Sequence, residues 1–168
     1  MKKNIVYLFA HQDDEFGVFI DIYKNIKIHN IHIFYLTNGD SKIIDKSKLS
    51  MRDRESIKVL TKIGVKKKNI IFLGKKLGIT CNQLYLNLDK VYRELLKNLK
   101  KIGIISSLIT HSWEGGHEDH DACNLIARKA ALKNKILTKS FEFYLYNSYK
   151  TRLIFFRVFN PITRNGKK

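Results

Sequence analysis

Near its N-terminus the chain reads IVYLFAHQDDE over residues 5–15. The first five residues are an uninterrupted apolar run, which is typical of a buried strand. Ionisable side chains follow at once, at His11, Asp13 and Asp14. In open α/β sheets, ligands bind where the strands end. We therefore predict that residues 4–10 form a buried strand whose end carries functional side chains.

A second stretch has the same plan. Residues 104–110 are another largely apolar run, and GGHEDH follows at 115–120. The two glycines lack a Cβ and allow close approach of backbone or ligand, and histidine is the commonest metal ligand in proteins. Two imidazoles and one carboxylate meeting at the strand ends would form an open metal site, with another carboxylate left to take a proton. Together the clusters predict a metal-assisted hydrolase, against the plainer interpretation that the acids only favour helix N-termini.

Strand and helix patterns alternate along the rest of the chain. Loops are predicted at 41–49, 74–81 and 111–119, and Ser50 and Asn82 are the expected N-caps of two helices. Alternation of this kind predicts an α/β fold, namely a Rossmann-like, mostly parallel sheet of about five strands with helices on both faces. The predicted strands are 4–10, 31–37, 69–73, 104–110 and 141–146, and the predicted helices are 15–27, 50–63, 82–101 and 120–133.

The composition is that of one globular domain. The chain has 168 residues, 44% of them hydrophobic, which suffices for an ordinary core in a single domain over residues 1–168. Cys81 and Cys123 match no zinc or redox spacing, so we expect reduced thiols and a cytoplasmic protein. No apolar segment has the length needed to cross a bilayer. The aromatic tail at 153–168 is consistent with a last strand, a packing arm or an exposed contact surface.

The net charge of +17 admits two interpretations. One is an anionic partner, such as nucleic acid, a membrane surface or a phosphorylated substrate. The other is a lysine-rich composition with lysines on solvated faces. The lysine clusters at 66–68, 75–76 and 97–101 fall at predicted helix ends and loops, which favours the second interpretation. No basic motif with interspersed aromatic residues is present, so we expect no nucleic-acid partner, and peripheral membrane contact stays an alternative.

Four short motifs resemble those of one protein family. AHQDDE at 10–15 is similar to the AHPDDE box of the LmbE-like (PIG-L) N-deacetylases, and GGHEDH at 115–120 resembles their GHPDH box. TNGD at 37–40 looks like their turn after the second strand, and RDRE at 52–55 looks like their Arg-x-x-Glu segment. The order and spacing fit from about residue 4 to residue 134.

The resemblance implies a metal-dependent hydrolase that removes the acetyl group from the 2-amino position of a glucosamine unit. By position, His11, Asp14 and His120 would hold one divalent metal per chain, usually zinc, although iron or cobalt suits the same ligands. Asp13 would be the general base for metal-bound water. His117 would stabilise the oxyanion and protonate the departing amine.

Three further residues receive roles through the same resemblance. Asp119 would orient a neighbouring histidine. Arg52 and Asp40 would contact the substrate, against the alternatives of a surface arginine and a turn-closing aspartate. The expected substrate is a small-molecule or lipid-linked acetylated amino sugar, and the basic surface suits a phosphorylated one.

Two departures from the family pattern and two rival functions accompany this prediction. Gln12 and Glu118 replace the prolines of the two boxes, and each proline would stiffen its loop. A non-haem iron enzyme is one rival, because two histidines and a carboxylate also form its facial triad, although such sites usually lie in β-barrels. The other rival is a basic nucleic-acid- or membrane-binding protein with a degenerate site.

Overall fold

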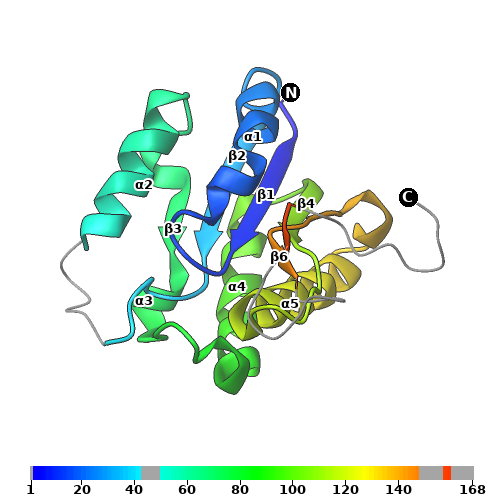
Figure 1. Cartoon of the computed structure of the whole chain (residues 1–168). Coiled ribbons are helices and arrows are strands. Elements are labelled where there is room, and N and C mark those ends of the chain that lie inside the picture. The colour runs from blue at the N-terminus through cyan, green and yellow to red at the C-terminus, as the bar shows by residue number, and fades with distance from the viewer. Residues whose placement is uncertain (1, 43–49, 148–156, 160–168) are drawn as a thin grey trace.

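Five parallel strands form the central sheet of the protein (Figure 1). A computed structural model describes residues 2–42, 50–147 and 157–159. The strands lie in the order β3-β2-β1-β4-β5, and every neighbouring pair is parallel. This arrangement confirms the predicted α/β class and the mostly parallel sheet. The strands are β1 (Asn4–Phe9), β2 (Asn30–Tyr35), β3 (Ile70–Phe72), β4 (Ile105–His111) and β5 (Phe141–Phe143).

Helices cover both faces of this sheet, because the strands carry apolar side chains on both sides. In β1, Ile5, Tyr7 and Phe9 pack in one core cluster, together with residues of α1 and α2. Val6 and Leu8 point the other way, into a second cluster with residues of α3, α4 and α5. The helices are α1 (Phe19–Asn25), α2 (Met51–Lys62), α3 (Leu73–Leu77), α4 (Leu88–Ile102) and α5 (Glu118–Lys133).

Several boundaries differ from those predicted. The first helical segment starts as a 3-10 turn before α1, and the predicted loop at 74–81 contains most of α3. Asn82 has a left-handed backbone with φ 59°, and Asn87 is the N-cap of α4 instead. Helix α5 begins at Glu118. The 3-10 turns are η1 (Asp14–Val18), η2 (Lys67–Asn69), η3 (Leu84–Asn87) and η4 (Leu137–Lys139).

The C-terminal region is described only in part. Strand β5 ends at Phe143 rather than near residue 146, and β6 (Tyr146–Asn147) pairs antiparallel with β7 (Arg157–Val158). Most of the predicted tail at 153–168 lies outside the described residues. Both cysteines are free, as expected for reduced thiols. Among the described helices, none combines the length and the apolar character that a membrane span requires.

The strand order places the two sequence clusters side by side. After β1 the chain moves outward to β2 and β3, then returns to add β4 on the other side of β1. The point between β1 and β4 is therefore the topological switch point of the sheet, where ligands bind in open α/β folds. The segment 10–15 follows β1 and the segment 112–120 follows β4, so both open into this crevice.

Candidate functional site

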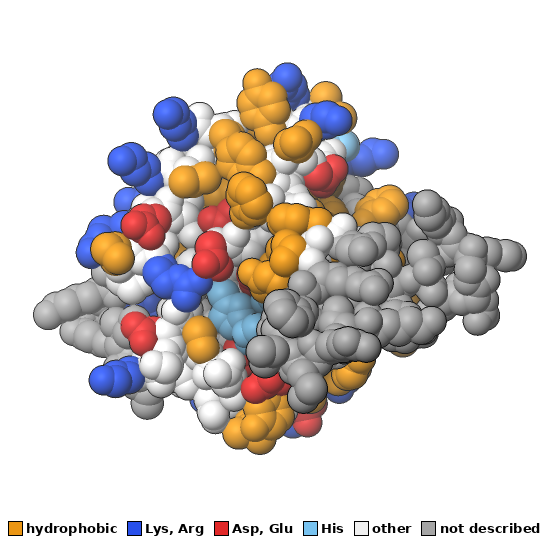
Figure 2. Space-filling model, viewed as in Figure 1, with side chains coloured by type: hydrophobic (Ala, Val, Ile, Leu, Met, Phe, Trp, Pro, Cys, Tyr) orange, Lys and Arg blue, Asp and Glu red, His pale blue; other side chains and the backbone are white. Residues whose placement is uncertain are grey.

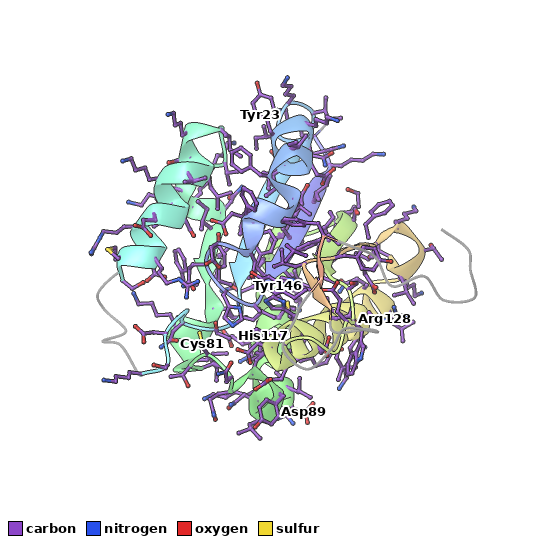
Figure 3. All side chains as sticks on the ribbon, in the orientation of Figure 1. Tyr23, Cys81, Asp89, His117, Arg128 and Tyr146 are labelled. Atoms are coloured by element: carbon purple, nitrogen blue, oxygen red, sulfur yellow. The ribbon has the colours of Figure 1, made fainter. Side chains whose placement is uncertain are left out.

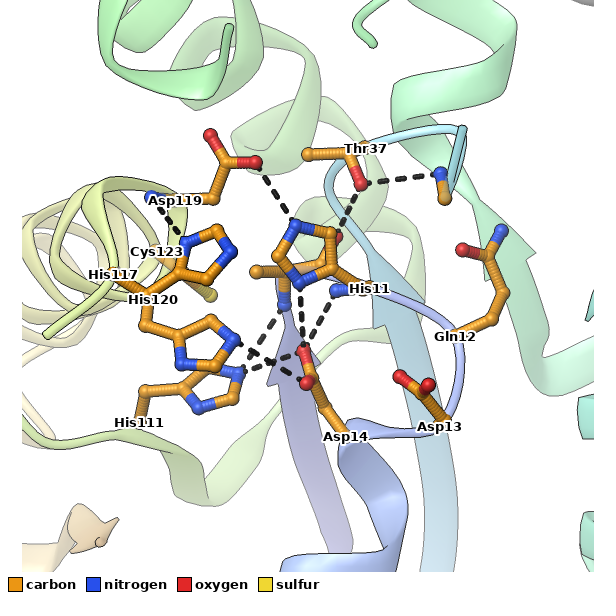
Figure 4. Close-up of polar contacts among 12 residues, drawn as sticks. His11, Gln12, Asp13, Asp14, Thr37, His111, His117, Asp119, His120 and Cys123 are labelled. Atoms are coloured by element: carbon orange, nitrogen blue, oxygen red, sulfur yellow. Dashed lines mark hydrogen bonds and ion pairs between the residues drawn. The ribbon is translucent and has the colours of Figure 1, made fainter. Parts of the chain in front are cut away.

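Three imidazoles surround the buried carboxylate of Asp14 at the switch point (Figure 4). His111 Nε2 lies 3.0 Å from Asp14 Oδ2, and His120 Nε2 lies 3.3 Å from Asp14 Oδ1. His11 Nδ1 is 3.6 Å from Asp14 Oδ2. His11 follows β1, His111 ends β4 and His120 lies in the first turn of α5. The structure thus brings together the three predicted metal ligands, His11, Asp14 and His120.

Asp14 is strongly favoured as a carboxylate in this position. Its backbone neighbour His11 N also donates to Oδ2, at 2.7 Å. Burial by itself raises the pKa of Asp14, but the neighbouring imidazoles outweigh it and hold the pKa well below its usual range. For His11, burial lowers the pKa, and hydrogen bonds to Asp119 and Asp14 outweigh burial and raise the pKa well above its ordinary value.

Asp119 lies behind His11 and contacts its ring. Its Oδ2 is 2.9 Å from His11 Nε2, and its two oxygens also accept from Asn82 N at 2.6 Å and Leu84 N at 3.0 Å. The hydrogen bonds from His11 and the two backbone amides overcome burial and lower the pKa of Asp119. With Nε2 held by Asp119, the Nδ1 atom of His11 faces Asp14. The orienting role of Asp119 stays a prediction.

His117 lies at the rim of the cluster and is half-buried. Its ring centroid is 4.9 Å from that of His11 and 4.5 Å from that of His120. As the N-cap of α5, its Nδ1 accepts from Asp119 N at 3.2 Å. A neutral His117 therefore carries its proton on Nε2. Burial lowers the pKa of His117, and the charges of His120 and His11 lower it further. Figure 3 labels this residue and Tyr146, whose ring stacks on His120 with centroids 5.5 Å apart.

Asp13 is set apart from the imidazoles, as its spacing from Asp14 predicts. Its side chain is 75% exposed, and its backbone is left-handed with φ 95°. Arg52 Nη2 contacts Asp13 Oδ2 at 2.8 Å. Desolvation by the surrounding protein raises the pKa of Asp13, although the positive charge of Arg52 opposes that rise. A carboxylate with a raised pKa at the edge of the cluster can accept a proton.

The two predicted substrate contacts differ in their surroundings. Arg52 reaches the crevice and also donates to Gln12 O at 2.5 Å and to Gly39 O at 2.6 Å. Its planar group therefore spans the turns that follow β1 and β2. Asp40 is exposed, and its Oδ1 accepts from Lys42 N at 3.3 Å. Among the described residues, Asp40 has no contact with the histidines, and turn closure accounts for its hydrogen bond.

Sequence reasoning missed two members of the site, His111 and Glu114. His111 is fully buried, and its ring stacks on His120 with centroids 4.0 Å apart. Burial lowers the pKa of His111 to about 4. Glu114 Oε2 accepts from Leu145 N at 3.0 Å and Tyr146 N at 2.8 Å, and so joins the loop after β4 to the segment after β5. The position of His111 at the end of an apolar strand is the signal that could have found it.

The donor set fits a divalent metal. Within the described part of the chain, three groups of three ligand atoms lie within 4.8 Å of one another: His11 with His117 and His120, Asp14 with His111 and His120, and His11 with Cys81 and Asp119. Among the described residues, the buried Nδ1 atoms of His111 and His120 have no hydrogen-bond partner. Imidazole nitrogen and carboxylate oxygen are the ligands of catalytic zinc sites. The particular set of His11, Asp14 and His120 stays a prediction.

Comparison with known proteins identifies relatives of this fold and sequence. The PIG-L family, described as GlcNAc-PI de-N-acetylase, matches residues 6–131. No curated protein matches the chain in sequence.

Three solved structures share the fold. N,N'-diacetylchitobiose deacetylase from Pyrococcus horikoshii, in complex with its inhibitor MPG, has a TM-score of 0.61 at 20% identity, over 88% of this chain and 60% of that one. A40926 pseudoaglycone deacetylase Dbv21 has a TM-score of 0.62 at 13% identity, over 90% of this chain and 66% of that one. The zinc-inhibited form of teicoplanin deacetylase Orf2 has a TM-score of 0.61 at 12% identity, over 89% of this chain and 69% of that one. The chain spans less than two thirds of the length of the first two.

Proposed function

Because the chain belongs to the PIG-L family, we propose that it is a metal-dependent N-deacetylase that releases acetate from an N-acetylglucosamine-containing conjugate. One observation carries the proposal. Asp14 and its three surrounding imidazoles converge at the switch point of the sheet, while the carboxylate of the preceding residue, Asp13, is 75% exposed and contacts Arg52 at 2.8 Å. Metal-assisted amide hydrolysis requires both parts, a ligand set and a separate base.

In this proposal His11, Asp14 and His120 hold the metal. When bound, a zinc ion supplies Lewis-acid chemistry, because it polarises the amide carbonyl and lowers the pKa of water. Asp119 keeps His11 Nδ1 directed at the ligand cluster through its 2.9 Å contact with Nε2. Teicoplanin deacetylase Orf2, which shares this fold, has a zinc-inhibited form. The metal of this chain therefore has to be measured, and iron or cobalt would fit the same donors.

The remaining steps use residues of this chain. Asp13 accepts a proton from the attacking water as the oxygen bonds to the carbonyl carbon. His117 presents Nε2–H to the carbonyl oxygen, which becomes negative as the C–O bond forms. The C–N bond then breaks, the amine nitrogen takes the proton that Asp13 accepted, and the acid product leaves as acetate. An imidazole whose pKa is lowered is neutral near pH 7 and can donate a hydrogen bond without carrying a charge.

Three features bear on the substrate. In this proposal Arg52, which lies beside Asp13, contacts a sugar hydroxyl or phosphate, and Asp40 in the turn after β2 is the second substrate contact. A cavity of about 420 Å³ adjoins Asp13 and Arg52, with apolar walls that include Phe16, Phe19 and Val59. Figure 2 shows hydrophobic side chains gathered on this face above the exposed histidine surface. These walls favour an apolar, lipid-like substituent. A phosphorylated conjugate, or contact with an anionic membrane in the cytoplasm, would suit the charge of +17, but the position of the lysine clusters at helix ends and loops does not by itself indicate such a partner.

Acetate release from a panel of N-acetylglucosamine conjugates tests the function. We expect the wild type to carry about one metal per chain and to release acetate. Asp13→Asn should abolish release and keep the metal, whereas His120→Ala should lose both. The exposed residue Glu118 provides a matched control, since Glu118→Ala should leave both properties unchanged. Metal binding without acetate release from any conjugate would refute the proposed reaction.

A further inference from the structure

Gln12 occupies the place of a family proline, and its side chain makes contacts that proline lacks. The residue is only 1% exposed. Its Nε2 donates to Asp53 Oδ1 at 2.6 Å and to Asn38 O at 3.2 Å. Its amide lies against Gly39, where an added Cβ would overlap the Gln12 amide. Gly39 also has a positive φ of 74°, so this turn accommodates the Gln12 side chain only because residue 39 is glycine.

Asp53 is a rigid anchor for the Gln12 amide. Its side chain is fully buried, and it forms a capping box with Ser50 at the start of α2. Asp53 Oδ2 also contacts Lys75 Nζ at 2.8 Å, and Lys75 is 6% exposed. A buried carboxylate that is paired and hydrogen-bonded on every side is costly to move. Gln12 is thereby attached to helix α2 and to α3.

The turn that carries Asp13 requires such support. A left-handed φ of 95° at a residue other than glycine is strained and persists only where the surroundings fix it. The first turn of α2 supplies two neighbouring attachments: Arg52 binds Gln12 O and Asp13 Oδ2, and Asp53 binds the Gln12 amide. The Asp13 N–H adds a third, to Glu15 Oε2 at 2.9 Å.

We propose that Gln12 is a positioning residue, which holds the Asp13 turn in its reactive conformation through the Gln12–Asp53 hydrogen bond. A proline would restrict this turn through its ring, whereas this chain restricts it through a side chain anchored on α2. The catalytic consequence rests on the proposed function, in which Asp13 is the base. The effect on the conformation of the turn does not depend on that function.

Gln12→Ala tests the proposal in two ways, with Gln83→Ala at an exposed glutamine as the matched control. Hydrogen exchange of metal-free protein should become faster in a peptide covering residues 10–17 and stay unchanged elsewhere. On the most active conjugate, kcat should fall about 10- to 100-fold, since small misplacements of reacting groups cost this much. KM and bound metal should stay close to wild type, because neither the substrate contacts nor the ligands change.

Exchanging the amide and the carboxylate of the Gln12–Asp53 contact distinguishes a positioning role from a general loss of stability. Gln12→Glu places a second carboxylate against Asp53 and should lower kcat at least as much as Gln12→Ala. Adding Asp53→Asn restores a carboxylate–amide pair with the same net charge, and kcat should recover. The proposal is overturned if Gln12→Ala matches Gln83→Ala in both exchange and kcat, or if the double variant is no better than Gln12→Glu. A wild type without deacetylase activity would refute the proposed function, and hydrogen exchange would still decide the role of Gln12.

Discussion

Removal of the Asp119 carboxylate should weaken both the fold and the metal site. Asp119 is fully buried and accepts hydrogen bonds from Asn82 N, Leu84 N and His11 Nε2. A buried donor left without a partner costs about 1–3 kcal/mol. Asp119→Ala leaves two backbone donors unpaired, so the free energy of unfolding should fall by about 2–6 kcal/mol. Asp119→Asn keeps one acceptor oxygen and should cost about 1–3 kcal/mol.

The same variants should also loosen the orientation of His11. Loss of a hydrogen-bond partner of a metal-bound histidine typically lowers metal affinity about 10- to 100-fold. Urea unfolding of the metal-free protein measures the first effect, and zinc affinity by competition with a chelator measures the second. Glu118→Ala, at the neighbouring exposed position, is the control and should change stability by less than about 1 kcal/mol. Asp119→Ala with the stability and zinc affinity of that control would refute the reasoning.

Three other predictions concern stability. Folding lowers the pKa of His111 to about 4, so the unfolded chain binds more protons than the folded chain between about pH 6.5 and 4. The free energy of unfolding should therefore decrease as the pH falls through this range, by up to about 1.4 kcal/mol per pH unit. Urea titrations should show a weaker dependence on pH in His111→Asn, and an equal dependence in both proteins would contradict this assignment. Zinc at a free concentration of 100 times its Kd should stabilise the wild type by about 2.7 kcal/mol, a gain that calorimetry should find absent in His120→Ala. Leu95 is buried in the core between α4 and the sheet, so Leu95→Ala should lower the free energy of unfolding by about 2–5 kcal/mol. The same change at the exposed Leu86 should lower it much less in the same denaturation assay.

The sheet could be predicted because its signals are local. Each strand is a short apolar run followed by a helical pattern, and Ser50 caps α2 as expected, accepting from Asp53 N. The errors occur where tertiary contacts override local preference. Asn82 is of a residue type that favours helix N-caps, but its N–H donates a hydrogen bond to Asp119. The chain therefore makes a 3-10 turn before α4 begins.

The site was predictable as far as its motifs extend. The spacing of His11 and Asp14 places them together and Asp13 apart, as the structure shows. His111 was missed because it stands outside both boxes and enters the cluster only through the pairing of β4 with β1. The Gln12–Asp53 contact joins residues 41 positions apart, and no sequence spacing indicates it.

The members of the histidine cluster come from two distant parts of the chain, one after β1 and the other at and after the end of β4. Asp14 and His111 are 97 positions apart in sequence, and His11 and Asp119 are 108 apart. Closing loops of this size is entropically costly and slow, so contacts across them form late in folding. The ligand cluster that we propose for the metal is therefore assembled only after β1 and β4 have paired. Partly folded chains would offer only separate single ligands, so we expect tight binding of the proposed metal to require the completed sheet.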